Sequence, residues 1–162
     1  MFIAIEPVTD ENRQTACGIQ AAQGQEGFVE TVRECLEEAE QVACWRPVLL
    51  RADGTAVGLA MYGLWEEEPP DGRVWLDRLL IDGRFQGRGI GTAGLSLLIR
   101  HIRSLYHRDA LYLSVYPENR TAARLYERFG FRFNGERDIH GEHVMVLQGD
   151  PCAADEKANR GL

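Results

Sequence analysis

The chain has 162 residues, of which 44% are hydrophobic and 27% charged, and its formal net charge is −7. This length and composition predict one soluble globular domain with a sizeable core, and no apolar run approaches the roughly 20 residues that a membrane span needs. The negative charge disfavours nucleic acid as a partner, because nucleic-acid binding requires a basic surface, and it is compatible with a small cationic ligand.

The four cysteines and four histidines do not have the spacing of a metal site. The cysteines form no CxxC pair, and the histidines form no HExxH motif. The first residues, up to Glu6, lack the basic region of a secretory signal. We therefore expect no metal, reduced thiols and a cytoplasmic protein.

The first half of the chain is expected to form a strand, two helices and a hairpin. The alternating stretch FIAIEPV predicts the strand. A helix capped by residues 9–11 is expected to run to about Gln23, and a second helix is expected from Gly27 onward. The two apolar runs of RPVLLRADGTAVGLAMYGLW flank Asp53-Gly54, which is a strong signal for a hairpin turn.

A nearly continuous apolar strand, VWLDRLLI, follows, with Asp77 and Arg78 in its middle. Next come a glycine-rich loop, the amphipathic helix TAGLSLLIRHIRSLY and the strand LYLSVY. The helix NRTAARLYERFG is expected to be capped by Asn119 and closed by Gly130.

FRFNGERDIHGEHVMVL predicts two final strands, with turns near Asn134-Gly135 and His140-Gly141. The order of these elements predicts an α/β domain (α+β in its mixture of strands and helices) over residues 1–148, built around a mixed sheet. Residues 149–162 are small, polar and aperiodic, and we expect a flexible tail.

The stretch RFQGRGIGTAG contains a GxGxxG spacing through Gly89, Gly91 and Gly94, but it does not fit a dinucleotide-binding site. Such a site needs the first glycine at the strand end and an acid that closes the next strand. Here several residues intervene before the glycines, and Asp109 precedes LYLSVY. A P-loop is excluded because no Gly-Lys-Ser/Thr follows.

The loop is nevertheless suited to hold an anion. Gly87, Gly89 and Gly91 allow the backbone to curl, so that N–H groups point into the space before the helix, whose N-terminus is electropositive. Arg84 and Arg88 flank the loop and could meet further phosphates. The alternative is a glycine-rich turn with solvated arginines.

The residues from Gln86 to Gly91 resemble the Q/R-x-x-G-x-G/A loop that grips the pyrophosphate of acetyl-CoA in the GNAT acetyltransferase superfamily. The residues from Asn119 to Phe131 are similar to its N-x-x-A-x-x-L-Y-x-x-x-G-F segment. Long stretches, including MYGLWEEEPPDGRVWLDRLLIDGRFQGRGIG, resemble the bacterial spermine/spermidine acetyltransferases. The resemblance spans residues 2 to about 147 and implies the GNAT fold, with a mixed, mostly antiparallel sheet of about seven strands and about four helices.

The resemblance implies an acetyl-CoA-dependent N-acetyltransferase that acts on a primary amine of a polyamine, with no metal. It implies that Tyr126 protonates the coenzyme A thiolate. The residue pattern alone also allows a core tyrosine, because Ala122, Tyr126 and Phe129 share one helical stripe. The coenzyme-binding positions implied are Leu79, Leu80, Ile81, Gln86, Gly87, Arg88, Gly89, Ile90, Gly91, Thr92 and Asn119.

Asp77 is the candidate base or amine-holding group, because a carboxylate inside an apolar strand is costly to bury and an ammonium substrate must lose a proton. The alternative is a structural ion pair with Arg78, which stands where some related polyamine enzymes carry a second acid. Further candidates for binding the amine are Glu30 and Glu34, one helical turn apart, and Asp82 after the strand. Other candidates are Glu66, Glu67 and Glu68, with Trp45, Trp65 and Trp75 for cation–π contacts.

Three other functions stay open on the sequence. The first is acetylation of another small amine or of a peptide amine. The others are a non-catalytic coenzyme-binding regulatory module and a polyamine-sequestering protein. Similar proteins are commonly dimers, so we expect a homodimer.

Overall fold

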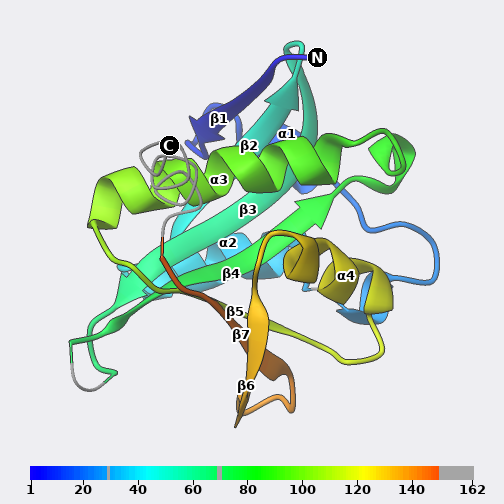
Figure 1. Cartoon of the computed structure of the whole chain (residues 1–162). Coiled ribbons are helices and arrows are strands. Elements are labelled where there is room, and N and C mark those ends of the chain that lie inside the picture. The colour runs from blue at the N-terminus through cyan, green and yellow to red at the C-terminus, as the bar shows by residue number, and fades with distance from the viewer. Residues whose placement is uncertain (29, 69–70, 150–162) are drawn as a thin grey trace, which may run out of the picture.

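A seven-stranded sheet crosses the molecule in the order β1-β2-β3-β4-β5-β7-β6 (Figure 1). This computed structural model describes residues 1–28, 30–68 and 71–149. Neighbouring strands pair antiparallel except for β4 and β5, which are parallel. The predicted fold class, a mixed and mostly antiparallel sheet, is therefore confirmed. The strands are β1 (Ile3–Pro7), β2 (Arg46–Ala52), β3 (Thr55–Trp65), β4 (Arg73–Ile81), β5 (Leu111–Val115), β6 (Arg132–Arg137) and β7 (His143–Leu147).

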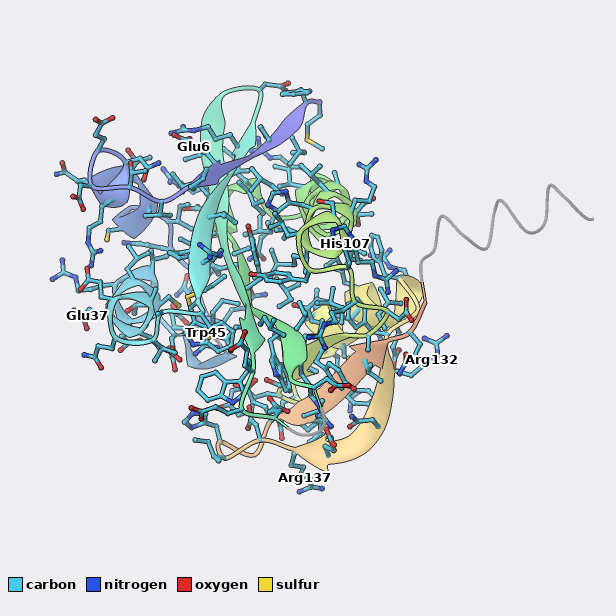
Figure 2. All side chains as sticks on the ribbon, turned by 90° about the vertical axis from the view of Figure 1, so that its left-hand side faces the viewer. Glu6, Glu37, Trp45, His107, Arg132 and Arg137 are labelled. Carbon is cyan, nitrogen blue, oxygen red and sulfur yellow. The ribbon has the colours of Figure 1, made fainter. Side chains whose placement is uncertain are left out.

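Helices cover both faces of the sheet. The α-helices are α1 (Arg13–Cys17), α2 (Val32–Gln41), α3 (Ile90–Tyr106) and α4 (Arg120–Arg128), with short 3-10 helices η1 (Glu26–Phe28) and η2 (Gly83–Phe85). Seen edge-on in Figure 2, the sheet has α2 on one side, with Glu37 pointing outward, and α3 on the other, ending beside His107. No helix within the described ranges is long and apolar enough to cross a membrane.

The central strands are apolar on both faces because each face carries its own core. Leu50 and Tyr62 belong to the core beneath α3 and α4, whereas Leu49 and Met61 belong to the core beneath α1 and α2. Successive residues of a strand point to opposite faces, so burial on both sides produces near-continuous apolar runs.

The two N-terminal helices differ from the prediction. The expected cap at residues 9–11 is wrong, because α1 begins after Asn12 and ends at Cys17, well short of Gln23. The helix expected from Gly27 begins at Val32 instead, where a reciprocal capping box with the preceding threonine fixes its start. Val29, expected on its apolar stripe, lies outside the described residues.

The hairpin turn at Asp53-Gly54 is confirmed, and both residues have the positive φ of a tight two-residue turn. The turn expected near Asn134-Gly135 is wrong. These residues lie inside β6 where its register with β7 shifts, and Gly135 has a φ of 87°, as a bulge allows. The chain turns near His140-Gly141, as predicted. Residues 150–162, which make up nearly all of the expected tail, lie outside the described residues.

Phe131 and Phe133 lie two positions apart but differ in burial, so together they test the described core. Phe131 is fully buried, whereas Phe133 is 44% exposed. We expect Phe131→Ala to lower the free energy of unfolding by about 3–5 kcal/mol, because it empties a packed site, and Phe133→Ala to cost less than about 1 kcal/mol. Urea denaturation of both variants measures this, and equal losses would contradict the described core.

Candidate active site

The sheet splits between β4 and β5. The two strands pair only at Val74 with Leu111 and Trp75 with Tyr112. Among the described residues, no strand pairs with β4 on the β5 side over residues 79–81. A strand edge left open in this way offers backbone N–H and C=O groups to an extended ligand.

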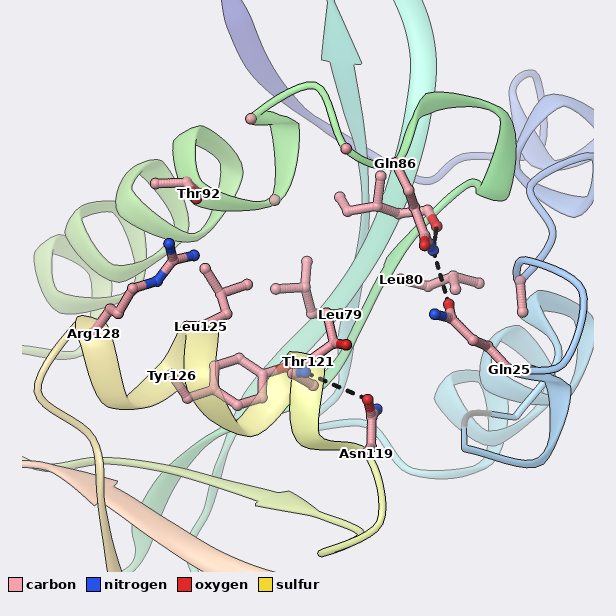
Figure 3. A pocket seen from close by; sticks show the side chains of 16 residues that line it. Gln25, Leu79, Leu80, Gln86, Thr92, Asn119, Thr121, Leu125, Tyr126 and Arg128 are labelled. Atoms are coloured by element: carbon pink, nitrogen blue, oxygen red, sulfur yellow. Dashed lines mark hydrogen bonds between the residues drawn. The ribbon is translucent and has the colours of Figure 1, made fainter.

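The first of two cavities lies at this split and has a volume of about 440 Å³ (Figure 3). We call it the loop cavity, because the glycine-rich loop and the start of α3 form one wall and α4 forms another. Gln86 donates to the carbonyl of Ile81 and to the side chain of Gln25, each at 3.0 Å, and so ties the loop to β4 and to the segment after α1. The predicted coenzyme-binding residues that line it are Leu79, Leu80, Ile81, Gln86, Gly87, Gly89, Gly91, Thr92 and Asn119.

The loop geometry leaves backbone donors free to bind an anion. Gly87 and Gly89 have φ of 75° and 79°, and a Cβ atom on either would meet nothing within 4 Å. Gly89 is the N-cap of α3 and supplies no side-chain acceptor. The first N–H bonded within the helix is that of Ala93, to the Gly89 carbonyl. The N–H groups just before Ala93 therefore have no helical partners, and they form the electropositive end of the helix.

Two predicted coenzyme positions do not line the loop cavity. The Ile90 side chain is buried in the core beneath α3, and the exposed Arg88 lies against the ring of Phe85. Arg128, at the end of α4, lines the cavity instead and adds a cation. No motif in the sequence indicates this position, because a basic residue in the last turn of a helix is ordinarily solvated.

The position of Asp82 does not support its predicted role in binding substrate. Its side chain is buried and accepts the backbone N–H groups of Gln20 and Arg84. The Arg84 side chain pairs with it at 2.9 Å, so this arginine is turned to Asp82. Arg84 accordingly lowers the pKa of Asp82. Asp82 lines neither cavity of the split and serves to fix the start of η2.

The second cavity, of about 360 Å³, is the acidic cavity. It continues from the loop cavity, because Leu79, Asn119, Ala122 and Tyr126 line both. Six carboxylates face it together with the side chains of Arg78 and His140. These carboxylates belong to Glu30, Glu34, Glu38, Asp77, Asp138 and Glu142. Within the described ranges, no three His, Cys, Asp or Glu side chains are arranged to share a metal ion.

Asp77 reaches the acidic cavity from an irregularity in β4. Met61 pairs with Arg78 and Tyr62 pairs with Leu76, so Asp77 is left without a partner on β3. Its carboxylate lies 2.7 Å from Arg78, which forms the ion pair considered above. Burial nevertheless raises the pKa of Asp77 to about 6, against the opposing effect of Arg78. An acid with this pKa changes protonation close to neutral pH.

Arg78 joins three of the six carboxylates. Besides Asp77, it contacts Glu30 at 2.9 Å and Glu38 at 3.4 Å. Glu30 and Glu34 do not share a helical face as predicted, because Glu30 precedes α2 and Glu34 closes its capping box. The other candidates lie elsewhere: Glu68 binds Trp75 and Arg73, and Trp45 stacks on Trp65.

Three acids of the cavity were missed, namely Glu38, Asp138 and Glu142. They come from α2 and from the turn before β7, more than 90 residues apart. No short motif contains them, and an acid on a helix or in a turn is usually solvated.

Tyr126 lies where the two cavities meet. The centroid of its ring lies 5.8 Å from that of Phe131, and the residue is 8% exposed. Figure 3 shows the phenol extending from α4 toward Leu79. Burial raises the pKa of Tyr126 to about 12, and the charge of Glu142 contributes to the rise. The tyrosine is therefore a member of the core that also lines the site.

A family model for the acetyltransferase (GNAT) family matches residues 12–131. The chain belongs to the GNAT family. It is 46% identical over 151 residues to a spermine/spermidine N(1)-acetyltransferase of Bacillus subtilis strain 168, a match that covers 91% of this chain and 99% of the relative. The family and this relative identify the chain as an acyltransferase, for which acetyl-CoA is the family's acetyl donor.

Solved structures share the GNAT fold at low sequence identity. An aminoglycoside acetyltransferase in complex with coenzyme A superimposes with a TM-score of 0.78 at 19% identity, covering 97% of this chain and 99% of that one. A spermidine N-acetyltransferase from Vibrio cholerae, in complex with coenzyme A and spermine, gives 0.68 at 15% identity, covering 91% and 95%.

Removing the cation of the acidic cavity should make stability depend on pH. In Arg78→Met, the carboxylates of Asp77, Glu30 and Glu38 lose their partner, and the pKa of Asp77, which the charge of Arg78 lowers, rises further in the folded state. The loss of stability is then largest at high pH, where the carboxylates are charged, and shrinks as they protonate. We expect a loss of about 3 kcal/mol near pH ~8 and about half of that near pH ~5.

Urea denaturation at both pH values measures this dependence. Arg13→Met is the control, because Arg13 pairs with Glu40 on the surface and its loss should cost under about 1 kcal/mol at either pH. A loss in Arg78→Met that does not change with pH would contradict the described pairing.

Proposed function

We propose that the chain is an acetyl-CoA-dependent N-acetyltransferase that acetylates a primary amine of spermidine or spermine. The observation that carries the proposal is the continuity of the loop cavity and the acidic cavity at Tyr126. An anion-binding loop on one side and six carboxylates on the other suit a phosphorylated donor and a polycationic acceptor. The name of the relative that is 46% identical supports the same substrate class.

The residues of the loop cavity fit coenzyme A. The free N–H groups between Gly87 and Thr92 would bind its diphosphate, and Arg128 would add a positive charge. The open edge of β4 at residues 79–81 would bind the pantetheine arm as a further strand would. Asn119 accepts the N–H of Ala122 and so caps α4, and its side chain also lines the path of that arm.

Acetyl-CoA supplies the acetyl group as a thioester, and the protein must manage the protons of the transfer. Asp77 accepts a proton from the substrate ammonium, and the free nitrogen then attacks the carbonyl carbon. A backbone N–H of β4 stabilises the carbonyl oxygen. As the carbon–sulfur bond breaks, Tyr126 gives its proton to the sulfur, and the proton that the new amide nitrogen releases restores the phenol.

The first test is the choice of amine. With acetyl-CoA, we expect release of free thiol with spermidine and spermine, and a kcat/KM at least ~10-fold lower for butylamine, because a monoamine lacks the second ammonium that the acidic cavity would hold. A thiol reagent follows the reaction. Equal rates with butylamine or a peptide amine would overturn the polyamine assignment, and coenzyme binding by calorimetry without turnover would indicate a non-catalytic module.

Two substitutions separate the proposed proton donor and acceptor. We expect Tyr126→Phe to lower kcat by ~10²–10⁴-fold at every pH while coenzyme A binding by calorimetry is kept. In the unmodified protein, kcat/KM should rise as pH passes about 6, because Asp77 must be ionised to act. Asp77→Asn should lose this rise. An unchanged rate in the first variant or an unchanged pH profile in the second would contradict the corresponding role.

A further inference from the structure

We propose that Glu142 is a second amine-binding carboxylate of this site, across the split from Asp77, and that Ser114 positions it. The inference rests on the proposed function and adds a residue to it. The residue after Asp77 in β4 is Arg78, and Asp77 is the one carboxylate that this strand contributes to the cavity. The second carboxylate would come from a segment about 65 residues further along the chain.

The sheet order brings Glu142 to this place. Glu142 directly precedes β7, and β7 pairs with β5 through Val115 with His143 and Ser114 with Val144. The strand next to β5 on its other side is β4, from which it separates after two residue pairs. Ser114 and Glu142 therefore lie on the β5 side of the split, and Asp77 lies on the β4 side.

The hydrogen bonds of Glu142 fix its carboxylate without neutralising it. Its Oε2 accepts the hydroxyl of Ser114 at 2.8 Å, and its backbone N–H is held by the carboxylate of Asp138. Side chain and backbone are thus both held at the cavity wall. A carboxylate held by a neutral donor keeps its full charge for a ligand.

The other acids of the cavity are engaged differently. Three of them contact Arg78, as described above. Glu34 is exposed and accepts the N–H of Thr31, and Asp138 accepts two N–H groups of its own turn. Among the lining residues that the structure describes, Glu142 therefore combines partial burial, a side-chain hydroxyl as its donor, and no contact with a cation.

Electrostatics place Glu142 near the reacting groups. Its negative charge raises the pKa of both Asp77 and Tyr126. Burial raises the pKa of Glu142 itself, and the hydrogen bond from Ser114 and the charge of Arg78 oppose that rise. An ammonium bound by Glu142 would lie beside the proposed base and the proposed acid. This is where an amine must be to attack a thioester whose sulfur is next to Tyr126.

Glu142→Gln is the decisive variant, because glutamine keeps the size and the acceptor for Ser114 but removes the charge. We expect the KM for spermidine to rise ~10–100-fold, as for the loss of a charge-assisted contact, with the KM for acetyl-CoA unchanged within ~2-fold. Glu127→Gln is the matched control, because Glu127 is exposed on α4 next to Tyr126 and lines neither cavity. Ser114→Ala should raise the KM for spermidine ~2–10-fold, because the carboxylate is then less well oriented.

The outcomes separate this inference from the function on which it rests. If the unmodified protein acetylates spermidine and Glu142→Gln behaves like Glu127→Gln, the inference is wrong and the proposed function stands. If Glu142→Gln raises both KM values equally and lowers the unfolding midpoint, the Ser114 contact only fastens β7 to β5, and the inference is again wrong. If Glu142→Gln does not fold, Ser114→Ala decides instead: a rise in the KM for spermidine without a rise in the KM for acetyl-CoA supports the inference, and an equal change in both contradicts it. If the unmodified protein does not act on spermidine, both proposals fail.

Discussion

The site depends on the short pairing between β4 and β5, which extends over two residue pairs. Two parallel strands in one sheet need a long crossover, and α3 provides it, beginning after η2 and the glycine-rich loop that follow β4. The same geometry therefore brings the N-terminus of α3 beside the part of β4 that β5 has left. Because the strands separate after Trp75, this part of β4 keeps free backbone groups, and both cavities open from the gap. The split thus supplies a helix end with unpaired N–H donors and an open strand edge together.

The acidic cavity balances stability against binding. Six carboxylates around one cavity repel one another, and three of them are partly relieved by Arg78. The guanidinium fixes the charges of one wall and leaves those of the other wall, including Glu142, without a cation in contact. A protein that neutralised every acid internally would be more stable but would offer no charge to a cationic ligand. Arg78 therefore sets how much of the negative charge the ligand itself must neutralise.

The sequence predicted what is local and missed what the fold assembles. The glycine loop, the capping Asn119 and the Asp53-Gly54 turn were recognised because their geometry depends on consecutive residues. Asp82 was proposed to bind substrate because it follows the strand that carries Asp77, and its hydrogen bond with the N–H of Gln20, 62 residues earlier, has no local signal. Glu142 had no signal at all, because a hairpin turn brings it beside β5 and nothing in its neighbours indicates this. Cap and glycine signals also overextended α1, since they mark possible helix ends but not where tertiary packing ends the helix.

Tyr126 is a core residue that also lines both cavities, so its burial affects the proton transfer that the proposed function assigns to it. Burial against Phe131 raises the pKa of the phenol to about 12, which keeps it protonated at neutral pH but also makes it a weak acid. Burial acts on sulfur in the same direction, as the thiol of Cys35 illustrates, with its pKa raised to about 11 by desolvation. A thiolate released beside Tyr126 would be similarly short of solvation and would become a stronger base. Under the proposed function, burial thus raises the pKa of the proton donor and that of the acceptor in parallel, so the packing that makes Tyr126 part of the core does not by itself oppose the transfer of its proton.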